Sequence, residues 1–200
     1  MSARFAELAF TPAVKRLQER HGSRAAYARR EAADGASDPL GPEEAAFIGE
    51  RDSFYMATVS ETGWPYLQHR GGPKGFLKVL DARTLAFADF RGNRQYVSAG
   101  NLEGNDRVAL ILVDYARRLR FKVLGRARVI DAPDDPGLMD SLRDSGYRVR
   151  VERGVVIRVE AFDWNCPQHI TPRFSEQELE ALIEPMHARI RELEEQLQSP

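Results

Sequence analysis

The sequence predicts a mainly β domain with peripheral helices, in which antiparallel strands form a barrel or a sandwich. Short segments rich in aromatic and β-branched residues recur between residues 53 and 162. Short turns rich in Gly, Asp and Ala separate several of them, which favours antiparallel neighbours. Helical patterns are confined to the first 50 residues, to two short interruptions between strands, and to the segment after residue 174.

Composition excludes several classes of protein. The chain is 42% hydrophobic and 30% charged, which is ordinary for a globular domain. Its net charge of −1 gives no general electrostatic reason to bind nucleic acid or an anionic membrane. No apolar run reaches the length of about 18 residues that a membrane span needs, and charged residues interrupt residues 1–20, unlike a signal peptide. A single cysteine, Cys166, forms no intrachain disulfide and fits a reducing cytoplasm.

Arginine outnumbers lysine strongly, since only 4 of the 29 basic residues are lysine. Arginine binds phosphates and carboxylates through a rigid fork of donors. Genome composition is the simple explanation for most of this excess. An individual arginine therefore indicates an anion site only where it belongs to a motif.

The first 50 residues are predicted to be helical. Thr11 and Pro12 form a start signal, because a hydroxyl caps the helix and Pro suits its first position. The predicted segments are helices over residues 13–20, 24–32 and 41–48, with a loop over residues 34–39.

Seven strands are predicted after residue 50. They are bounded by turn residues such as Glu61-Thr62-Gly63 and Asp81-Ala82-Arg83. Two helices, over residues 94–102 and 136–144, lie between them. The predicted strands cover residues 54–59, 65–70, 76–80, 84–89, 108–114, 118–130 and 153–162.

The C-terminal segment has an apolar seam of alternating spacings of four and three, which is a heptad pattern. Ser175 and Glu178 form a capping box at its start. Two interpretations stay open: the helix packs on its own domain, or it pairs with another subunit. Pro185 is expected to kink the helix or force a restart. The seam residues are Leu179, Ile183, Met186, Ile190, Leu193 and Leu197.

The predicted organisation therefore has three parts. An N-terminal helical segment over residues 1–50 packs on a β domain over residues 51–174, and an amphipathic helix follows over residues 175–200.

A phosphate site is predicted where the strand over residues 84–89 gives way to a helix. Helix N-termini offer free backbone N–H groups and the positive end of a dipole. Gly92 allows close approach, Asn93 could cap the helix, and Arg94 offers a charge-assisted fork to an oxyanion. A purely structural junction is the alternative interpretation.

A second polar cluster, Gln68-His69-Arg70-Gly71, ends the strand over residues 65–70 and leads into Gly72. Its amide and guanidinium donors could reach the edge of a planar heterocycle that approaches the backbone. A bulge with a solvated arginine is the alternative.

The segment over residues 163–173 is predicted to be a polar, aromatic loop, of the kind that often carries function. Trp164 offers a stacking face, and His169 a donor or acceptor. Cys166 is expected to be a small buried thiol, not a nucleophile, because no catalytic signature surrounds it. The sequence contains no G-x-S-x-G, Walker or H-E-x-x-H motif, and metal binding has no support.

Residues 85–113 resemble the pyridoxamine 5'-phosphate oxidase-like flavoproteins. The run Leu-Ala-Phe-Ala-Asp-Phe-Arg-Gly-Asn-Arg-Gln-Tyr leads to Asn105-Asp106-Arg107-Val108-Ala109-Leu110, which matches that family's Asn-x-x-Val-Ala-Leu-like signature. The resemblance covers about residues 47–162. It implies a split β-barrel that binds FMN between two subunits of a homodimer.

The resemblance also assigns residues to the cofactor. Arg94 stands at the phosphate-binding arginine, whereas Gln95 stands where the oxidases have a lysine, so the site has one charge fewer and Arg91 or Arg70 could compensate. Arg120 corresponds to a position that approaches the flavin from the partner subunit. The other implied flavin contacts are Gln68, His69, Arg70, Gly71, Ala88, Asp89, Trp164, Gln168 and His169.

The implied activity is that of an FMN-dependent oxidoreductase acting on an unknown small molecule. The arginine-containing C-terminal substrate motif of the true oxidases is absent, so oxidation of pyridoxamine phosphate is not expected. Three alternatives remain: a non-catalytic flavin carrier or sensor, a deazaflavin-binding variant, and a heme-binding split barrel. Heme would need an axial ligand, for which His69, His169 and His187 are the candidates.

Overall fold

The computed structural model describes residues 2–31 and 39–198. The chain divides into two compact units. The first contains residues 1–113 and 120–166, and the second contains residues 114–119 and 167–200. Two predicted segments lie partly outside the described residues: residues 34–38 of the loop, and residue 32 at the end of the helix over residues 24–32.

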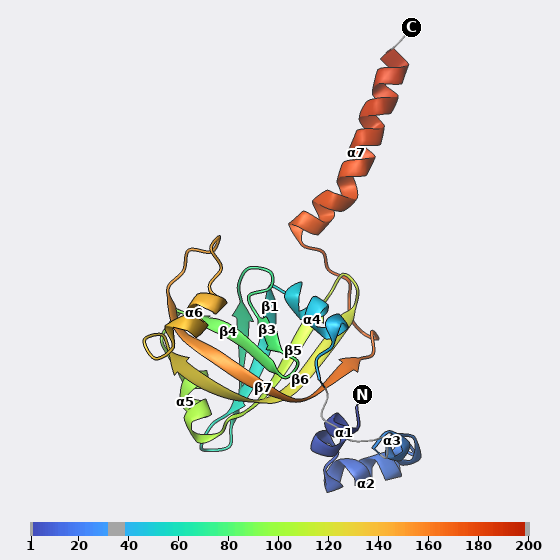
Figure 1. Ribbon diagram of the computed structural model, residues 1–200. Coiled ribbons are helices and arrows are strands. Elements are labelled where there is room, and N and C mark those ends of the chain that lie inside the picture. The colour runs from blue at the N-terminus through green and yellow to red at the C-terminus, as the bar shows by residue number, and fades with distance from the viewer. Residues whose placement is uncertain (1, 32–38, 199–200) are drawn as a thin grey trace. The chain divides into compact units, whose positions relative to one another are not determined.

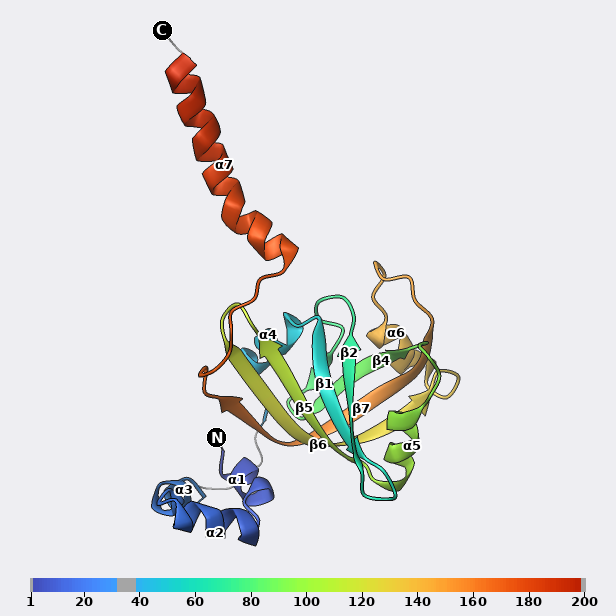
Figure 2. The same ribbon diagram turned by 180° about the vertical axis from the view of Figure 1, so that it is seen from behind.

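The core of the first unit is one seven-stranded antiparallel sheet with the strand order β2-β1-β5-β6-β7-β4-β3. The sheet curls into a split barrel, seen from two sides in Figures 1 and 2. The prediction of a mainly β domain with peripheral helices is confirmed. The strands are β1 (Ser53–Val59), β2 (Pro65–Gly71), β3 (Lys78–Asp81), β4 (Thr84–Phe90), β5 (Arg107–Asp114), β6 (Leu119–Asp131) and β7 (Val151–Asn165).

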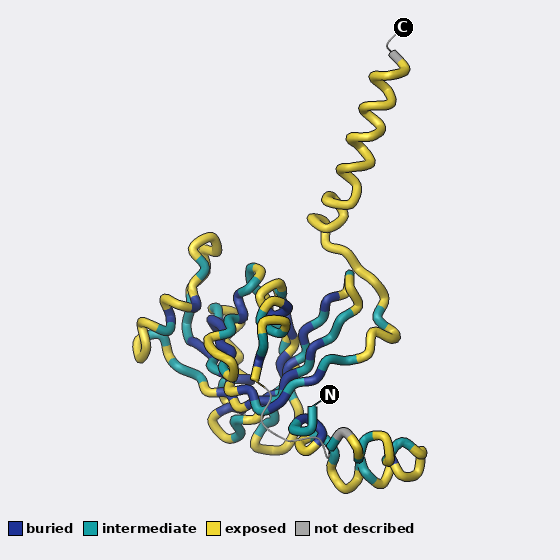
Figure 3. Tube along the Cα trace, turned by 45° about the vertical axis from the view of Figure 1, so that its right-hand side comes forward, coloured by how far each residue is buried: buried dark blue, intermediate teal, exposed yellow. Residues whose placement is uncertain are grey.

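Alternating side chains build the interior of the barrel. In β5, Val108, Leu110 and Leu112 are buried while their neighbours are more exposed, as expected when successive side chains point to opposite faces. The middle of β4, from Leu85 to Asp89, is buried on both faces. Figure 3 follows this buried layer along the strands. Full burial of each large apolar side chain contributes roughly 1.5–3 kcal/mol.

Helices of the first unit cover parts of the sheet and its ends. At the end of α6, Leu142 packs with Ala86 and Ala88 of β4. In α4, Phe47 packs against Phe121 of β6. No helix among the described residues combines the length and the apolar character that a membrane crossing requires. The helices are α1 (Ala3–Ala9), α2 (Pro12–Arg20), α3 (Arg24–Glu31), α4 (Pro42–Gly49), α5 (Val97–Gly104) and α6 (Pro136–Leu142).

Several elements differ from the prediction, and three of the differences have a local cause or consequence. Helix α1 was not predicted, although Ser2 caps it by accepting a hydrogen bond from the Phe5 amide. The third strand begins at Lys78, two residues later than expected, because a turn through Gly75 (φ 77°) precedes it. Strand β7 continues to Asn165, so the segment predicted as a loop from residue 163 begins as strand.

The second unit contains the C-terminal helix α7 (Glu176–Gln198). The predicted capping box is present, since the Glu178 amide donates to Ser175 Oγ at 3.3 Å and the Ser175 amide donates to the Glu178 carboxylate at 2.8 Å. The helix is assigned without interruption through Pro185, so the expected restart is not observed.

The long pair of strands β6 and β7 changes register between Leu124 and Gly125. A Cβ atom placed on Gly125 would lie 2.7 Å from the Arg158 carbonyl oxygen and 2.9 Å from Ile157 Cγ2. Because the nearest obstacle is backbone, it cannot move aside cheaply. The glycine is therefore required for the close approach of the two strands.

We expect Gly125→Ala to lower the free energy of unfolding by about 1–3 kcal/mol, the usual cost of overpacking. Gly100→Ala is the matched control, because no atom lies within 4 Å of its added Cβ and alanine favours a helix interior. Chemical denaturation of both variants measures the difference. Equal stability of the two variants would contradict this account of Gly125.

Candidate functional site

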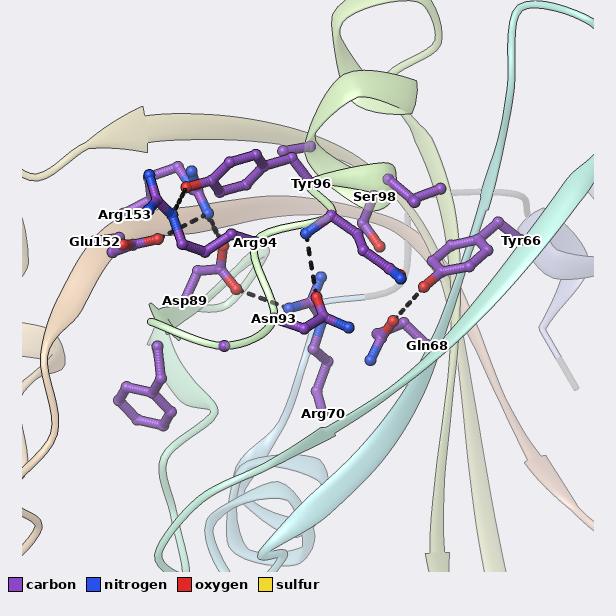
Figure 4. Close-up of a pocket in the computed structure, with 15 residues that line it drawn as sticks. Tyr66, Gln68, Arg70, Asp89, Asn93, Arg94, Tyr96, Ser98, Glu152 and Arg153 are labelled. Carbon is purple, nitrogen blue, oxygen red and sulfur yellow. Dashed lines mark hydrogen bonds and ion pairs between the residues drawn. The ribbon is translucent and has the colours of Figure 1, made fainter.

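A polar cavity of about 200 Å³ opens in the first unit. Strand β2, the end of β4, the loop from β4 to α5, the start of α5 and the start of β7 all contribute to it, and Figure 4 shows the side chains around it. Its lining consists of Tyr66, Gln68, Arg70, Asp89, Phe90, Gly92, Asn93, Arg94, Gln95, Tyr96, Val97, Ser98, Ala99, Glu152 and Arg153.

The buried carboxylate of Asp89 holds two arginines at the base of this cavity. Arg70 Nη1 donates to Asp89 Oδ1 at 2.7 Å, and Arg153 donates to Oδ2 from Nη2 at 2.8 Å and from Nε at 3.1 Å. Asp89 and Arg153 are opposite each other in the β4–β7 register, whereas Arg70 comes from β2, an edge strand of the sheet. The carboxylate thus fixes two guanidinium groups from different strands.

A second group of side chains surrounds Tyr96. The Arg153 guanidinium lies over the Tyr96 ring at 4.6 Å from its centroid, and Arg94 Nε donates to the Tyr96 hydroxyl at 2.9 Å. This hydrogen bond, followed by the charges of Tyr96 and Glu152, raises the pKa of Arg94 above its ordinary value. Burial lowers the pKa of Arg153, but the hydrogen bonds and charge of Asp89 outweigh it, so the net shift is upward. Both arginines therefore stay cationic.

The loop before α5 adopts an unusual backbone. Arg94 (φ 61°) and Tyr96 (φ 56°) are both left-handed, a conformation that is uncommon without glycine and that often marks functional sites. Between them, the Gln95 amide donates to Asn93 Oδ1 at 3.1 Å. The helix starts at Val97, so Asn93 does not cap it as predicted; Tyr96 holds the cap position and makes no side-chain capping bond.

The first turn of α5 leaves donors facing the cavity. The amides of Val97, Ser98 and Ala99 have no acceptor inside the helix, because the first turn of any helix lacks them, and all three residues line the cavity. The Ser98 hydroxyl is buried, with the residue 5% exposed, and finds no hydrogen-bond partner in the described part of the chain. The buried Arg70 Nε is also unsatisfied there. Such groups are costly unless a ligand or water satisfies them.

A smaller cavity of about 140 Å³ adjoins the first, because Arg70, Asp89 and Phe90 line both. His69, Gly71 and Ala88 belong to this second cavity. The His69 ring contacts Tyr55 edge-on at 5.4 Å between centroids.

Most of the residues predicted for the cofactor thus converge in space. Those lining one or both cavities are Gln68, His69, Arg70, Gly71, Ala88, Asp89, Asn93, Arg94 and Gln95.

Arg120 and Trp164 line neither cavity. The Arg120 guanidinium donates to the Cys166 carbonyl at 2.7 Å. The Trp164 indole N–H donates to Glu44 at 2.9 Å, and its ring packs against Phe47 and Phe121. Gln168 and His169 belong to the second unit.

Eight lining residues were not among the candidate site residues of the sequence analysis: Tyr66, Phe90, Tyr96, Val97, Ser98, Ala99, Glu152 and Arg153. Tyr96 and Ser98 directly follow the predicted motif, so the run from Arg94 could have been extended to them. Glu152 and Arg153 reach the site only through the β4–β7 pairing, which no local pattern specifies.

Two further findings concern reactive groups. Cys166 is exposed, so the prediction of a buried thiol is wrong; its position just beyond the end of β7 places it outside the packed sheet. Within residues 2–31 and 39–198, no three His, Cys, Asp or Glu side chains are grouped to hold a metal ion.

The chemistry of the larger cavity suits an anion. Three arginines (Arg70, Arg94 and Arg153) face two carboxylates (Asp89 and Glu152), which leaves one excess positive charge. Free amides at a helix N-terminus and a buried hydroxyl add neutral donors, the combination that phosphate sites use.

The sequence over residues 40–160 matches the family model described as pyridoxamine 5'-phosphate oxidase. This match spans more than half of the 200 residues. The chain belongs to the pyridoxamine 5'-phosphate oxidase family. No curated protein matches the sequence.

Solved structures align with this chain at low identity. HupZ from Group A Streptococcus aligns with a TM-score of 0.51 and 18% identity, covering 68% of this chain and 99% of its own. General Stress Protein 26 from Bacillus anthracis aligns with a TM-score of 0.46 and 16% identity, covering 66% and 95%. An FMN-binding protein from Syntrophomonas wolfei aligns with a TM-score of 0.43 and 11% identity, covering 75% and 97%. At these identities, the likeness to HupZ shows the fold alone.

We expect Asp89→Asn to destabilise the protein by roughly 3 kcal/mol, because it leaves two largely buried guanidinium groups without their shared carboxylate. Asp140→Asn is the control, since Asp140 pairs with Arg143 on the surface, where an ion pair contributes about 0–1 kcal/mol. Thermal and chemical unfolding compare the two. An Asp89→Asn protein as stable as the control would show that the ion pairs of Asp89 with Arg70 and Arg153 are dispensable for stability.

Proposed function

We propose that the protein binds FMN, with the phosphate group in the larger cavity, and acts as an FMN-dependent oxidoreductase on a small molecule. The observation that carries this proposal is the buried Ser98 hydroxyl, which has no hydrogen-bond partner among the described residues and lies at the start of α5, where no side chain caps the helix. A bound phosphate would supply acceptors to both. Membership of the pyridoxamine 5'-phosphate oxidase family supports flavin as the bearer of that phosphate.

The residues present fit a phosphate monoester. Arg94 offers a cation whose Nε donates to the Tyr96 hydroxyl, and its two terminal nitrogens make no hydrogen bond within the described residues. Arg70 and Arg153 are already oriented by Asp89, so they need little rearrangement to face an anion. Gln95, which replaces a lysine of the oxidases, leaves the charge to these arginines.

When bound, FMN would supply the redox chemistry, as flavins do in other oxidoreductases. The protein's residues would bind and orient it. The first turn of α5 and Arg94 would hold the phosphate, and Gln68 would offer its amide in the larger cavity. His69 and Gly71 would offer a polar ring and close backbone approach in the smaller cavity.

A second subunit would complete the site. Ligand pockets usually measure about 300–1,000 Å³, and the larger of the two adjoining cavities measures about 200 Å³ in one chain. The outward face of β1, β2 and β5 carries apolar side chains, with Tyr55 37% and Leu67 62% exposed beside the partly exposed Ile111. We propose that this face packs in a homodimer and that Arg120, absent from its own chain's cavities, approaches the partner's flavin.

An absorption spectrum of the purified protein, followed by mass spectrometry of the small molecules released by heat, tests the cofactor. Released FMN would support the proposal. A deazaflavin would keep the site and change the chemistry. A heme Soret band, or a colourless protein that also fails to bind added FMN, would overturn it.

We expect Arg94→Ala to weaken FMN binding by about 10- to 100-fold, because a hydrogen bond to a charged group contributes roughly 1.5–3 kcal/mol. Riboflavin, which lacks the phosphate, should bind both proteins equally. Arg16→Ala, on the exposed surface of α2, is the control. Fluorescence titration gives the affinities, and an unchanged FMN affinity would remove Arg94 from the phosphate site.

Ser98→Ala separates ligand binding from folding. In the ligand-free protein the hydroxyl is buried without a partner, so its removal should leave the stability unchanged or slightly higher. FMN affinity should fall by several-fold, since a neutral hydrogen bond contributes about 0.5–1.5 kcal/mol. Parallel measurement of ligand-free unfolding and FMN titration checks this; a loss of stability without loss of affinity would assign Ser98 a structural role.

A further inference from the structure

Helix α7 presents an apolar stripe that its own unit leaves uncovered. Figure 3 shows the described part of the helix exposed along its length. Each apolar side chain of the stripe is at least 41% exposed, and Leu197 is 86% exposed. A 23-residue helix with an internal proline is not expected to be stable alone in water, because most helix stability comes from packing. The stripe therefore needs an apolar partner.

The residue types in the stripe favour a coiled coil of two helices. In heptad terms, Ile183, Ile190 and Leu197 occupy the a positions, and Leu179, Met186 and Leu193 occupy the d positions. Two of the three a positions are isoleucine and two of the three d positions are leucine, and isoleucine at a combined with leucine at d favours parallel two-stranded coiled coils over trimers or tetramers. Pro185 falls at a c position, on the outer side of the helix, where its ring does not enter the seam.

The charged residues beside the stripe favour a parallel orientation of the two helices. In a parallel pair, each g residue faces the e residue five positions later on the partner, which places Arg189 opposite Glu194 twice. In an antiparallel pair centred on the same seam, Arg189 would face Arg189, and Glu180 would face Glu194. Of the two arrangements, only the parallel one brings opposite charges together. The antiparallel one brings like charges together, which disfavours it.

We propose that α7 pairs with α7 of a second copy of this chain as a parallel, in-register, two-stranded coiled coil. The seam covers about three heptads, which is short for a free coiled coil. Tethering through paired barrels would raise the effective concentration of the helices to about the millimolar range. The tethering rests on the homodimer of the proposed function, whereas the heptad pattern and the flanking charges favour pairing independently of it.

Disulfide trapping in the full-length chain tests the pairing. Cys166→Ser first removes the exposed native thiol, and Ile190→Cys is then added. Parallel helices place the two introduced thiols opposite each other, within the Cα separation of about 4.4–6.8 Å that a disulfide requires. We expect most chains to become covalent dimers under mild oxidation, at a rate independent of protein concentration.

Ala188→Cys, at an outward f position, is the matched control and should cross-link at least tenfold more slowly. An Ile190→Cys protein that cross-links no faster than this control overturns the proposal and indicates that α7 packs elsewhere. Co-expressed Met186→Cys and Ile190→Cys chains that cross-link only with each other would indicate antiparallel helices and also overturn it.

Charge exchange tests the direction independently. Arg189→Glu or Glu194→Arg alone should slow cross-linking of the Ile190→Cys protein by several-fold, and the double exchange should restore it. Because Arg189 also contacts Glu192 within the helix, Glu192→Gln serves as the control and should have little effect. No recovery in the double variant would rule out the Arg189–Glu194 pairing and with it the parallel arrangement.

Light scattering and FMN content are measured on the same samples, and on a chain that lacks residues 175–200. Failure of cross-linking in a dimeric, FMN-loaded protein overturns the coiled coil alone. Efficient cross-linking in a protein without flavin supports the coiled coil and overturns the proposed function. The truncated chain should form a weaker dimer than the full chain; an equally tight dimer would contradict the helix pairing.

Discussion

The ion pair between Asp89 and Arg70 joins parts of the sheet that hydrogen bonding along the strands leaves apart. Arg70 lies on β2, one edge of the seven-stranded sheet, and Asp89 lies on β4, next to the other edge. Arg153 binds the same carboxylate from β7. One buried side chain thus links three strands across the split of the barrel. Because both guanidinium groups also line the larger cavity, the contact that closes the barrel is the contact that shapes the site.

The loop from β4 to α5 uses this frame in a different way. Two left-handed residues, Arg94 and Tyr96, turn the chain so that α5 begins at Val97 with its first amides toward the cavity. Such conformations persist only where the surroundings hold them. Here the Tyr96 ring is held under Arg153, and its hydroxyl accepts a hydrogen bond from Arg94. The loop from β4 to α5 and the ion pairs of Asp89 therefore support each other through Arg153.

Local patterns predicted the strands well because their inward and outward side chains alternate, as in β5. They also marked two separate clusters, one with Gln68 and Arg70 and one with Asp89 and Arg94, since these lie at strand ends or near glycines. Only the family resemblance assigned the two clusters to one cofactor. They failed where long-range pairing decides. Arg153 reaches the cavity through its register with Asp89, and Trp164 extends β7 and bonds to Glu44 from α4. The helix start was misplaced because Asn93 forms a turn with Gln95 that competes with capping.

The excess positive charge of the cavity has a kinetic consequence. The whole chain carries a net charge of −1, so a distant dianion experiences no general attraction. The excess positive charge among the lining residues would attract an anion locally, but at physiological ionic strength screening limits its range to about 8 Å. Capture of an anion therefore depends on collisions close to the mouth, and encounter rates should be modest and only weakly sensitive to salt. Retention, set by slow escape from donors already in place, would then govern how long a ligand stays with the protein.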